Sequence, residues 1–361
     1  MAFLGGAWAG KFVNILPPAT LRRAAPADRS QDILAYFHFA RFLTVIVLAC
    51  FLFVIRPLLW NPQNLFSLFR VDTGLLSYKY FLTDVNPNGY ATLINLNLLS
   101  FSLYLTLLAG PSVSRKIKSK VLKDIAVLLT FFYVPYIIFI TSRSLVLYVF
   151  LSATAIYLLQ SKTNSVFFFS ISAFAAASFA FLMEWLRWGW IFSQQNDLSL
   201  VDLRTMRFVL EILVYQYIAA DFNSALVLLA HPSSYNLLWG SSLSFFFPGD
   251  PVEIANLSGT IHLFGIWWIS FGCFAYPLVF FMGFLLEHIY LMALRSPSRI
   301  NLYLVLYLMA YPGLFAITRI NYFLLNSFLV PLAFFLVFSI LLSMRQGNVP
   351  IPIHAKRGNL A

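Results

Sequence analysis

Arg204, Arg207 and Glu211 have the spacing of side chains that share one face of a helix. Arg207 follows Arg204 by three positions and Glu211 follows Arg207 by four, so the three project from the same side of a helical segment. Two neighbouring guanidinium groups can each offer a fork of donors to the oxygens of a phosphate or pyrophosphate. The pattern predicts an anion site; the alternative is a surface ion pair or an anchor for lipid headgroups.

Two further arginines lie in very short connections between apolar stretches. Arg143 stands in a Thr-Ser-Arg-Ser sequence and Arg319 in Thr-Arg-Ile-Asn. Positive charge is disfavoured in the external loops of membrane proteins, so both arginines are candidates for facing a common external cavity. The alternative for each is snorkelling to lipid phosphate.

Four residues could accept a proton in the same region. His231 and His262 are candidates because a neutral imidazole can take the proton of a sugar hydroxyl and so make the oxygen a nucleophile. Glu211 and Asp221 are the competing carboxylates. A structural histidine near a helix end is the alternative for each imidazole.

The composition places these residues in a membrane protein. Of 361 residues, 60% are apolar or aromatic and 10% are charged, and the mean hydropathy is +0.81. The net charge of +11 comes from cations in short loops, so nucleic acid is not an expected partner. The sequence predicts an all-α, polytopic integral membrane protein of about eight (8–11) transmembrane helices, with a large periplasmic loop that contains amphipathic helices.

Eight apolar runs are long enough, or nearly so, to cross about 30 Å of hydrocarbon. They are expected at about 38–60, 89–110, 125–141, 145–160, 165–185, 268–292, 301–317 and 322–344. The chain then divides into a cytoplasmic N-terminal segment (1–37), lying along the inner surface, a transmembrane domain (38–344) and a cytoplasmic tail (345–361). Glu287 and His288 fall near the inner end of a span and are interpreted as boundary residues.

The distribution of positive charge sets the expected topology. The densest basic cluster, in the expected loop at 111–124, belongs in the cytoplasm by the positive-inside rule. With alternating loops, 16 of the 24 lysines and arginines then lie inside. Treating residues 208–230 as a span would leave 12 on each side, so this stretch is placed in a periplasmic loop at 186–260. The loop is expected to lie on the membrane, with one or two helices within residues 198–230, where there is neither Gly nor Pro.

Several kinds of chemistry have no sequence motif here. The chain has no Walker-type loop, no His-Glu-x-x-His and no Gly-x-Ser-x-Gly, and no Asp-x-Asp that would hold a metal-bound nucleotide sugar. Cys50 and Cys273 fall in apolar stretches and are interpreted as packing residues. No metal or cofactor is expected. The few charges in the spans and the lack of an inverted repeat also disfavour a secondary transporter.

The layout resembles the Wzy-type polymerases of bacterial oligosaccharide repeat units. The resemblance covers about residues 125–345. It rests on the Ser-Arg-Ser turn at 142–144, the loop helix with Arg204, Arg207 and Asn223, the segment 240–251, and Phe271-Gly272 followed by Pro277 and Gly283. It implies a multi-span protein of the inner membrane with its active site facing the periplasm.

The resemblance also implies an activity. Such enzymes transfer a growing glycan from one undecaprenyl pyrophosphate to the terminal sugar of a second lipid-linked repeat unit, and they use no nucleotide. The implied partners are this lipid-linked oligosaccharide, membrane lipid and a chain-length regulator protein. The implied pyrophosphate-binding residues are Arg143, Arg204, Arg207 and Arg319; His231 or His262 would be the base and Asn223 would position sugar hydroxyls.

Two other activities stay open. A glycosyltransferase that uses a polyprenyl-phosphate sugar would typically carry paired acids in its first outer loop, where Asp72 and Asp84 are well separated. A flippase or transporter would move a lipid-linked glycan without lengthening it.

Overall fold

The computed structural model describes the chain in segments, all of which are helices or the turns between them. The described residues are 4–7, 9, 29–60, 89–136, 143–160, 170, 174, 178, 181–182, 184–215, 272–295, 302–316 and 326–347. No strand occurs within these ranges. The predicted all-α class is therefore confirmed for the part of the chain that is described.

Three helices are long and apolar enough to cross a membrane. Their apolar segments are Ile33–Arg56 in α2 (Arg29–Trp60), Thr92–Ala109 across α5 (Gly89–Ile94) and α6 (Leu96–Ala109), and Ala275–Leu294 in α15 (Ala275–Arg295). Three shorter apolar segments, Leu147–Tyr157, Leu302–Leu314 and Ser327–Leu342, lie where three further spans are predicted. These helices support membrane association. The total of about eight spans stays a prediction, because much of 165–185 lies outside the described residues.

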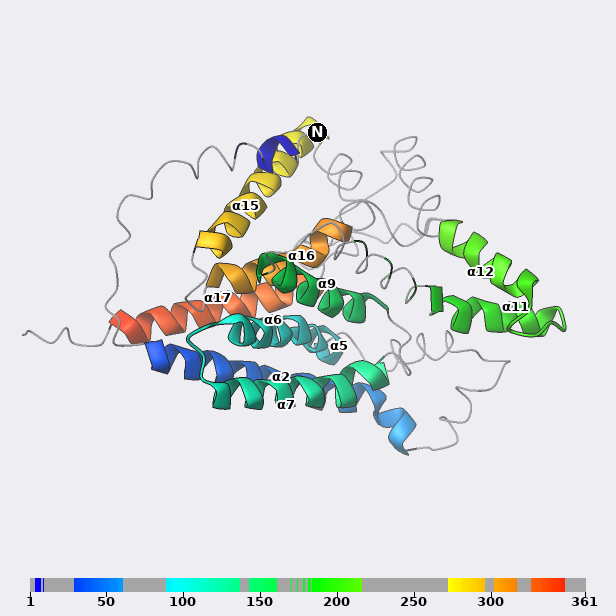
Figure 1. The fold of residues 1–361 in the computed structure, drawn as a ribbon, viewed down its shortest axis with the longest axis horizontal. Coiled ribbons are helices and arrows are strands. Elements are labelled where there is room, and N and C mark those ends of the chain that lie inside the picture. Colours follow the sequence, from blue (N-terminus) through cyan, green and yellow to red (C-terminus); the bar gives the residue numbers. More distant parts are fainter. Residues whose placement is uncertain are drawn as a thin grey trace, which may run out of the picture.

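The centre of the fold is α6. Its residues 96–107 are all buried, because α2, α7 (Arg115–Leu128), α9 (Arg143–Gln160), α16 (Leu302–Ala316) and α17 (Asn326–Gly347) all pack against it. Figure 1 shows this arrangement, with α2 and α7 on one side of α6 and α16 and α17 on the other. Large apolar side chains cover the outward faces of the surrounding helices, as is expected of surfaces in contact with lipid.

Several polar side chains of α6 form hydrogen bonds inside the bundle. The Thr44 hydroxyl lies 2.8 Å from Ser100 Oγ and 3.0 Å from the Tyr104 hydroxyl, which ties α2 to α6. The Tyr133 hydroxyl donates to Asn97 Oδ1 at 2.7 Å and so ties the helical turn that follows α7 to α6. Buried hydrogen bonds of this kind fix the relative register of helices, because each lost partner leaves a desolvated polar group.

The basic segment that we predicted as a loop at 111–124 is mostly helical. The Ser114 side chain caps α7 by accepting from the Ile117 N–H at 3.4 Å, so the helix begins at Arg115 and places the cations on its first turns. The helix then continues through a π-helical turn, η2 (Leu129–Tyr133), to residue 136. The sequence analysis treated this segment only as a connection between spans and did not predict its helix, which the capping serine and the absence of Gly and Pro after it favour.

Two helix ends differ from the predicted boundaries. α2 begins at Arg29, within the segment predicted to precede the membrane domain, because Ile33, Tyr36 and Phe37 are buried in the core. Residues 4–7 form a helical turn packed on the first half of α15, where a Cβ on Gly6 would collide with the Phe280 carbonyl. The sequence did not predict that contact.

Candidate functional site

The predicted arginine helix is present as α12 (Leu203–Val214). Asp202 caps it, with its side chain accepting from the Arg204 N–H at 2.8 Å. Thr205 and Val209 are buried on one face, whereas Arg204, Arg207 and Glu211 are exposed on the other. The three charged residues therefore share a face, as their spacing predicts, and that face is open to solvent or ligand.

A helical hairpin holds α12 in place. Its first arm consists of a π-helical turn, η3 (Trp185–Gly189), and α11 (Trp190–Gln195), and α12 packs against both. The rings of Phe192 and Phe208 stack across the hairpin with centroids 4.1 Å apart.

Short contacts make the hairpin compact. The Trp185 indole N–H donates to the Leu200 carbonyl at 2.9 Å, and the Thr205 hydroxyl donates to the Ser199 carbonyl at 3.1 Å. Gly189 permits the close approach of the two arms, because a Cβ there would lie 3.1 Å from Val209 Cγ2 and 2.9 Å from Trp185 Cδ1. The connecting turn uses Asp197 at a φ of 50°, a left-handed conformation that Asp tolerates better than most residues.

The two arginines have different surroundings. Arg207 Nε donates to Glu211 Oε1 at 2.8 Å, and the two side chains are 82% and 61% exposed. An ion pair this exposed contributes little stability, but it orients the guanidinium. Within the described part of the chain the Arg204 guanidinium has no ion-pair or hydrogen-bond partner.

The structure places the remaining predicted residues only in part. Arg143 is the first residue of α9. Asp221, Asn223, His231, His262 and Arg319 lie outside the described residues, so their predicted roles stay predictions. Glu211 is a partner of Arg207, and it would have to leave that pair to act as a base.

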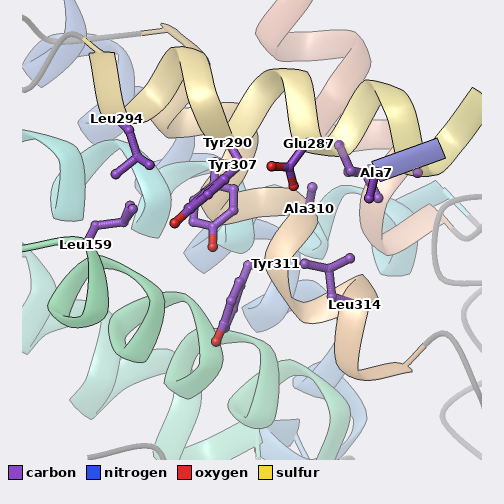
Figure 2. A pocket seen from close by; sticks show the side chains of 11 residues that line it. Ala7, Leu159, Glu287, Tyr290, Leu294, Tyr307, Ala310, Tyr311 and Leu314 are labelled. Carbon is purple, nitrogen blue, oxygen red and sulfur yellow. The ribbon is translucent and has the colours of Figure 1, made fainter. Parts of the chain in front are cut away.

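A second polar cluster, which the sequence analysis missed, lines a cavity between α15 and α16. The cavity has a volume of about 450 Å³. Glu287 and Tyr290 reach it from α15, and Tyr307 and Tyr311 reach it from α16 (Figure 2). The ring centroids of Tyr290 and Tyr307 are 5.3 Å apart, and those of Tyr307 and Tyr311 are 5.6 Å apart.

Glu287, which we interpreted as a boundary residue, lines this cavity. Its carboxyl group lies among tyrosines on a helix that is apolar enough to span a membrane (Figure 2). Ionisable residues inside such helices are rare and commonly functional. A sequence signal existed only for the α15 part of this cluster: Glu287 and Tyr290 form an (i, i+3) pair that, with His288, interrupts an apolar run.

Metal-binding clusters are not found in the described ranges, where no three His, Cys, Asp or Glu side chains converge. Cys50 is buried in α2, Cys273 is exposed in the short helix before α15, and both thiols are free. Comparison with protein-family models, curated proteins and solved structures finds no match.

Proposed function

We propose that this protein polymerises oligosaccharide repeat units carried on undecaprenyl pyrophosphate, at the periplasmic face of a bacterial inner membrane. The observation that carries the proposal is the pair Arg204 and Arg207, exposed together on a capped helix whose position is fixed by a packed hairpin. Preorganised cations are what a reaction with a pyrophosphate leaving group requires.

The location of the hairpin agrees with this proposal. In Figure 1, α12 lies at the opposite end of the helical bundle from the first turns of α7, which carry the densest basic cluster of the chain. The positive-inside rule assigns that basic end to the cytoplasm. The arginines of α12 would then be on the outer side, where lipid-linked repeat units await polymerisation.

The proposed reaction forms one bond and breaks another at the same sugar carbon. A hydroxyl oxygen of the acceptor sugar attacks the anomeric carbon of the growing chain, and the bond from that carbon to the pyrophosphate oxygen breaks. The electron pair of that bond stays on undecaprenyl pyrophosphate, and the hydroxyl proton passes to a base, for which His231 and His262 are the candidates.

The arginines would stabilise the charge that develops on the departing group. Side chains three positions apart on a helix lie about 5–6 Å apart at their Cβ atoms, so two guanidinium groups can bind neighbouring oxygens of one pyrophosphate. Because the Glu211 carboxylate engages Nε of Arg207, the ion pair directs the two terminal amino groups of Arg207 toward a ligand. Glu211 would thereby position Arg207.

The test is to delete the gene in its native host, complement it and separate the surface glycans by size. Wild-type protein should restore a long-chain ladder, and Arg204→Ala/Arg207→Ala should insert normally but leave single repeat units. Arg56→Ala is the control, since it removes one arginine from the end of α2 that is also expected outside. A normal ladder from the double variant would overturn the role of the arginines; an unchanged ladder in the deletion strain would overturn the function.

A second candidate function is transport of a lipid-linked glycan, and the cavity with Glu287 favours it. A carboxyl group among tyrosines between two apolar helices can bind a proton or a sugar hydroxyl. The length of the lipid-linked glycan distinguishes transport from synthesis. If the protein is a polymerase, purified protein in vesicles with lipid-linked repeat units should produce glycans of two or more joined units. Movement of unchanged units across the bilayer, lost in Glu287→Gln, would establish transport instead.

A further inference from the structure

The first turns of α7 carry a surface groove that belongs to neither site described above. It is lined by Arg115, Lys118, Ser119, Leu122, Lys123 and Ala126 and has a volume of about 460 Å³. Most of these positions follow one another at helical spacing, so the groove runs along one face of the helix. Three cations and one hydroxyl thus converge on a single strip of surface.

The charge of this groove is not neutralised from within its own helix. Asp124 is the one acidic residue of α7. Its two carboxylate oxygens accept from Arg41 Nε at 2.7 Å and from a terminal nitrogen of Arg41 at 3.0 Å. Since Arg41 belongs to α2, Asp124 faces that helix, and its side chain is only 14% exposed. Among the residues that the structure describes, the cations of the groove therefore remain available to an external anion, with the positive end of the helix dipole behind them.

The same face carries apolar residues between and beyond the cations. Leu122 is 57% exposed and Leu129, two turns further on, is 42% exposed, with exposed Ala126 between them. A ligand that matches this surface has an anionic group at one end and an apolar chain at the other. A soluble phosphate would match only the first part.

We propose that this groove binds an anionic phospholipid, with its phosphate among Arg115, Lys118 and Lys123 and an acyl chain along Leu122 and Leu129. Basic residues on an amphipathic helix at a membrane surface attract anionic headgroups. The groove adds a defined position to that attraction. The proposal holds whichever side of the membrane this end of α7 occupies.

The test compares two variants that remove the same charge. Lys118→Gln/Lys123→Gln removes two cations from the groove, and Lys116→Gln/Lys120→Gln removes two from the same turns that do not line it. Purified full-length protein in detergent is titrated with phosphatidylglycerol or phosphatidylcholine, and bound lipids are counted by native mass spectrometry. We expect wild-type protein to prefer phosphatidylglycerol, the groove variant to bind it about tenfold more weakly, and the control variant to change less than about twofold.

Each other outcome overturns the proposal. Equal losses in the two variants would mean attraction to net charge without a site, and equal binding of the two lipids would mean no recognition of the anion. Inorganic phosphate that displaces the lipid at millimolar concentration would identify a phosphate site in place of a lipid site. Lys118→Arg/Lys123→Arg, which keeps the cations, should bind like the wild type and so excludes loss of folding as the cause.

Discussion

Arg204 and Arg207 project from one face of α12 but make different hydrogen bonds. Arg207 is oriented by Glu211 through one hydrogen bond of 2.8 Å, whereas the backbone N–H of Arg204 is engaged with the capping residue Asp202. Both guanidinium groups are exposed. The proposed role depends on the forked hydrogen-bond donors of the guanidinium groups. Two sets of substitutions test whether these donors are needed or whether positive charge alone is enough.

Replacing both arginines by lysine, in Arg204→Lys/Arg207→Lys, keeps the charge and removes the forks. We expect the rate of chain extension to fall about tenfold or more, because a lost hydrogen bond to a charged group is worth about 1.5–3 kcal/mol. The measurement is product length against time in vesicles containing lipid-linked repeat units. A rate equal to that of the wild type would show that point charges suffice and that bidentate geometry is not used.

Glu211→Gln distinguishes a positioning carboxylate from a base. The ion pair it removes is highly exposed, so the thermal unfolding midpoint should hardly change. We expect a modest reduction in chain extension, since Arg207 loses its orientation but keeps its donors. Complete loss of extension by a folded Glu211→Gln protein would assign the base to Glu211 and remove that role from His231 and His262.

At the scale of elements, the hairpin of α11 and α12 determines where the arginines lie. Its two arms meet at Gly189, next to Val209 and to a Trp185 ring that is fixed by its bond to Leu200. The arms have little room to adjust, because the tryptophan cannot rotate away without losing that hydrogen bond. A side chain at Gly189 should therefore move α12 as a unit.

Gly189→Val tests this dependence. The added methyl groups should separate the arms, leave helices α2 and α6 intact, and reduce chain extension at least as strongly as the lysine variants do. Limited proteolysis supplies an independent measure, with faster cleavage expected between residues 196 and 202. Normal activity together with unchanged proteolysis would contradict the tight packing at this position.

The contact between α2 and α6 offers a second test at the element scale. Thr44→Val keeps the shape of a buried side chain and removes the hydroxyl that lies near Ser100 and Tyr104. We expect a loss of about 1 kcal/mol in stability, measured as a lower unfolding midpoint in detergent. Val45→Thr is the control, since Val45 is exposed on the outer surface of the same helix and should tolerate a hydroxyl with less effect.

At the scale of the whole molecule, hydropathy predicts the helices better than it predicts their ends. The apolar run near 89–110 contains Thr92–Ala109, and the run near 268–292 overlaps most of Ala275–Leu294, because long apolar segments have few other structures available to them in lipid. The start of α7 was not predicted, since the charge at 111–124 was interpreted only for topology, while the capping Ser114 sets the local structure. The spacing of Arg204, Arg207 and Glu211 was sufficient to predict their shared face.

The cavity at Glu287 could not be predicted in the same way. It exists because α15 and α16 pack together and bring Tyr290 beside Tyr307. These two tyrosines are too far apart in the sequence for a local pattern to connect them. Hydropathy assigns each residue a depth in the membrane but does not assign it a neighbour. Contacts between helices follow from packing, and the sequence alone does not supply them.

The arrangement of the bundle leads to a prediction about sidedness. The basic turns of α7 and the hairpin with α12 lie at opposite ends of the helices (Figure 1), so Lys116 and Arg204 should lie on opposite sides of the membrane. Single cysteines at these positions, in a chain with Cys50→Ala and Cys273→Ser, can be labelled in intact cells with a membrane-impermeant maleimide. We expect labelling of Arg204→Cys in intact cells and of Lys116→Cys only after the membrane is opened. Labelling of both from outside would mean that the helices do not span the bilayer in this orientation, and the reverse pattern would place the arginines of α12 on the cytoplasmic side, where they could not act on periplasmic repeat units.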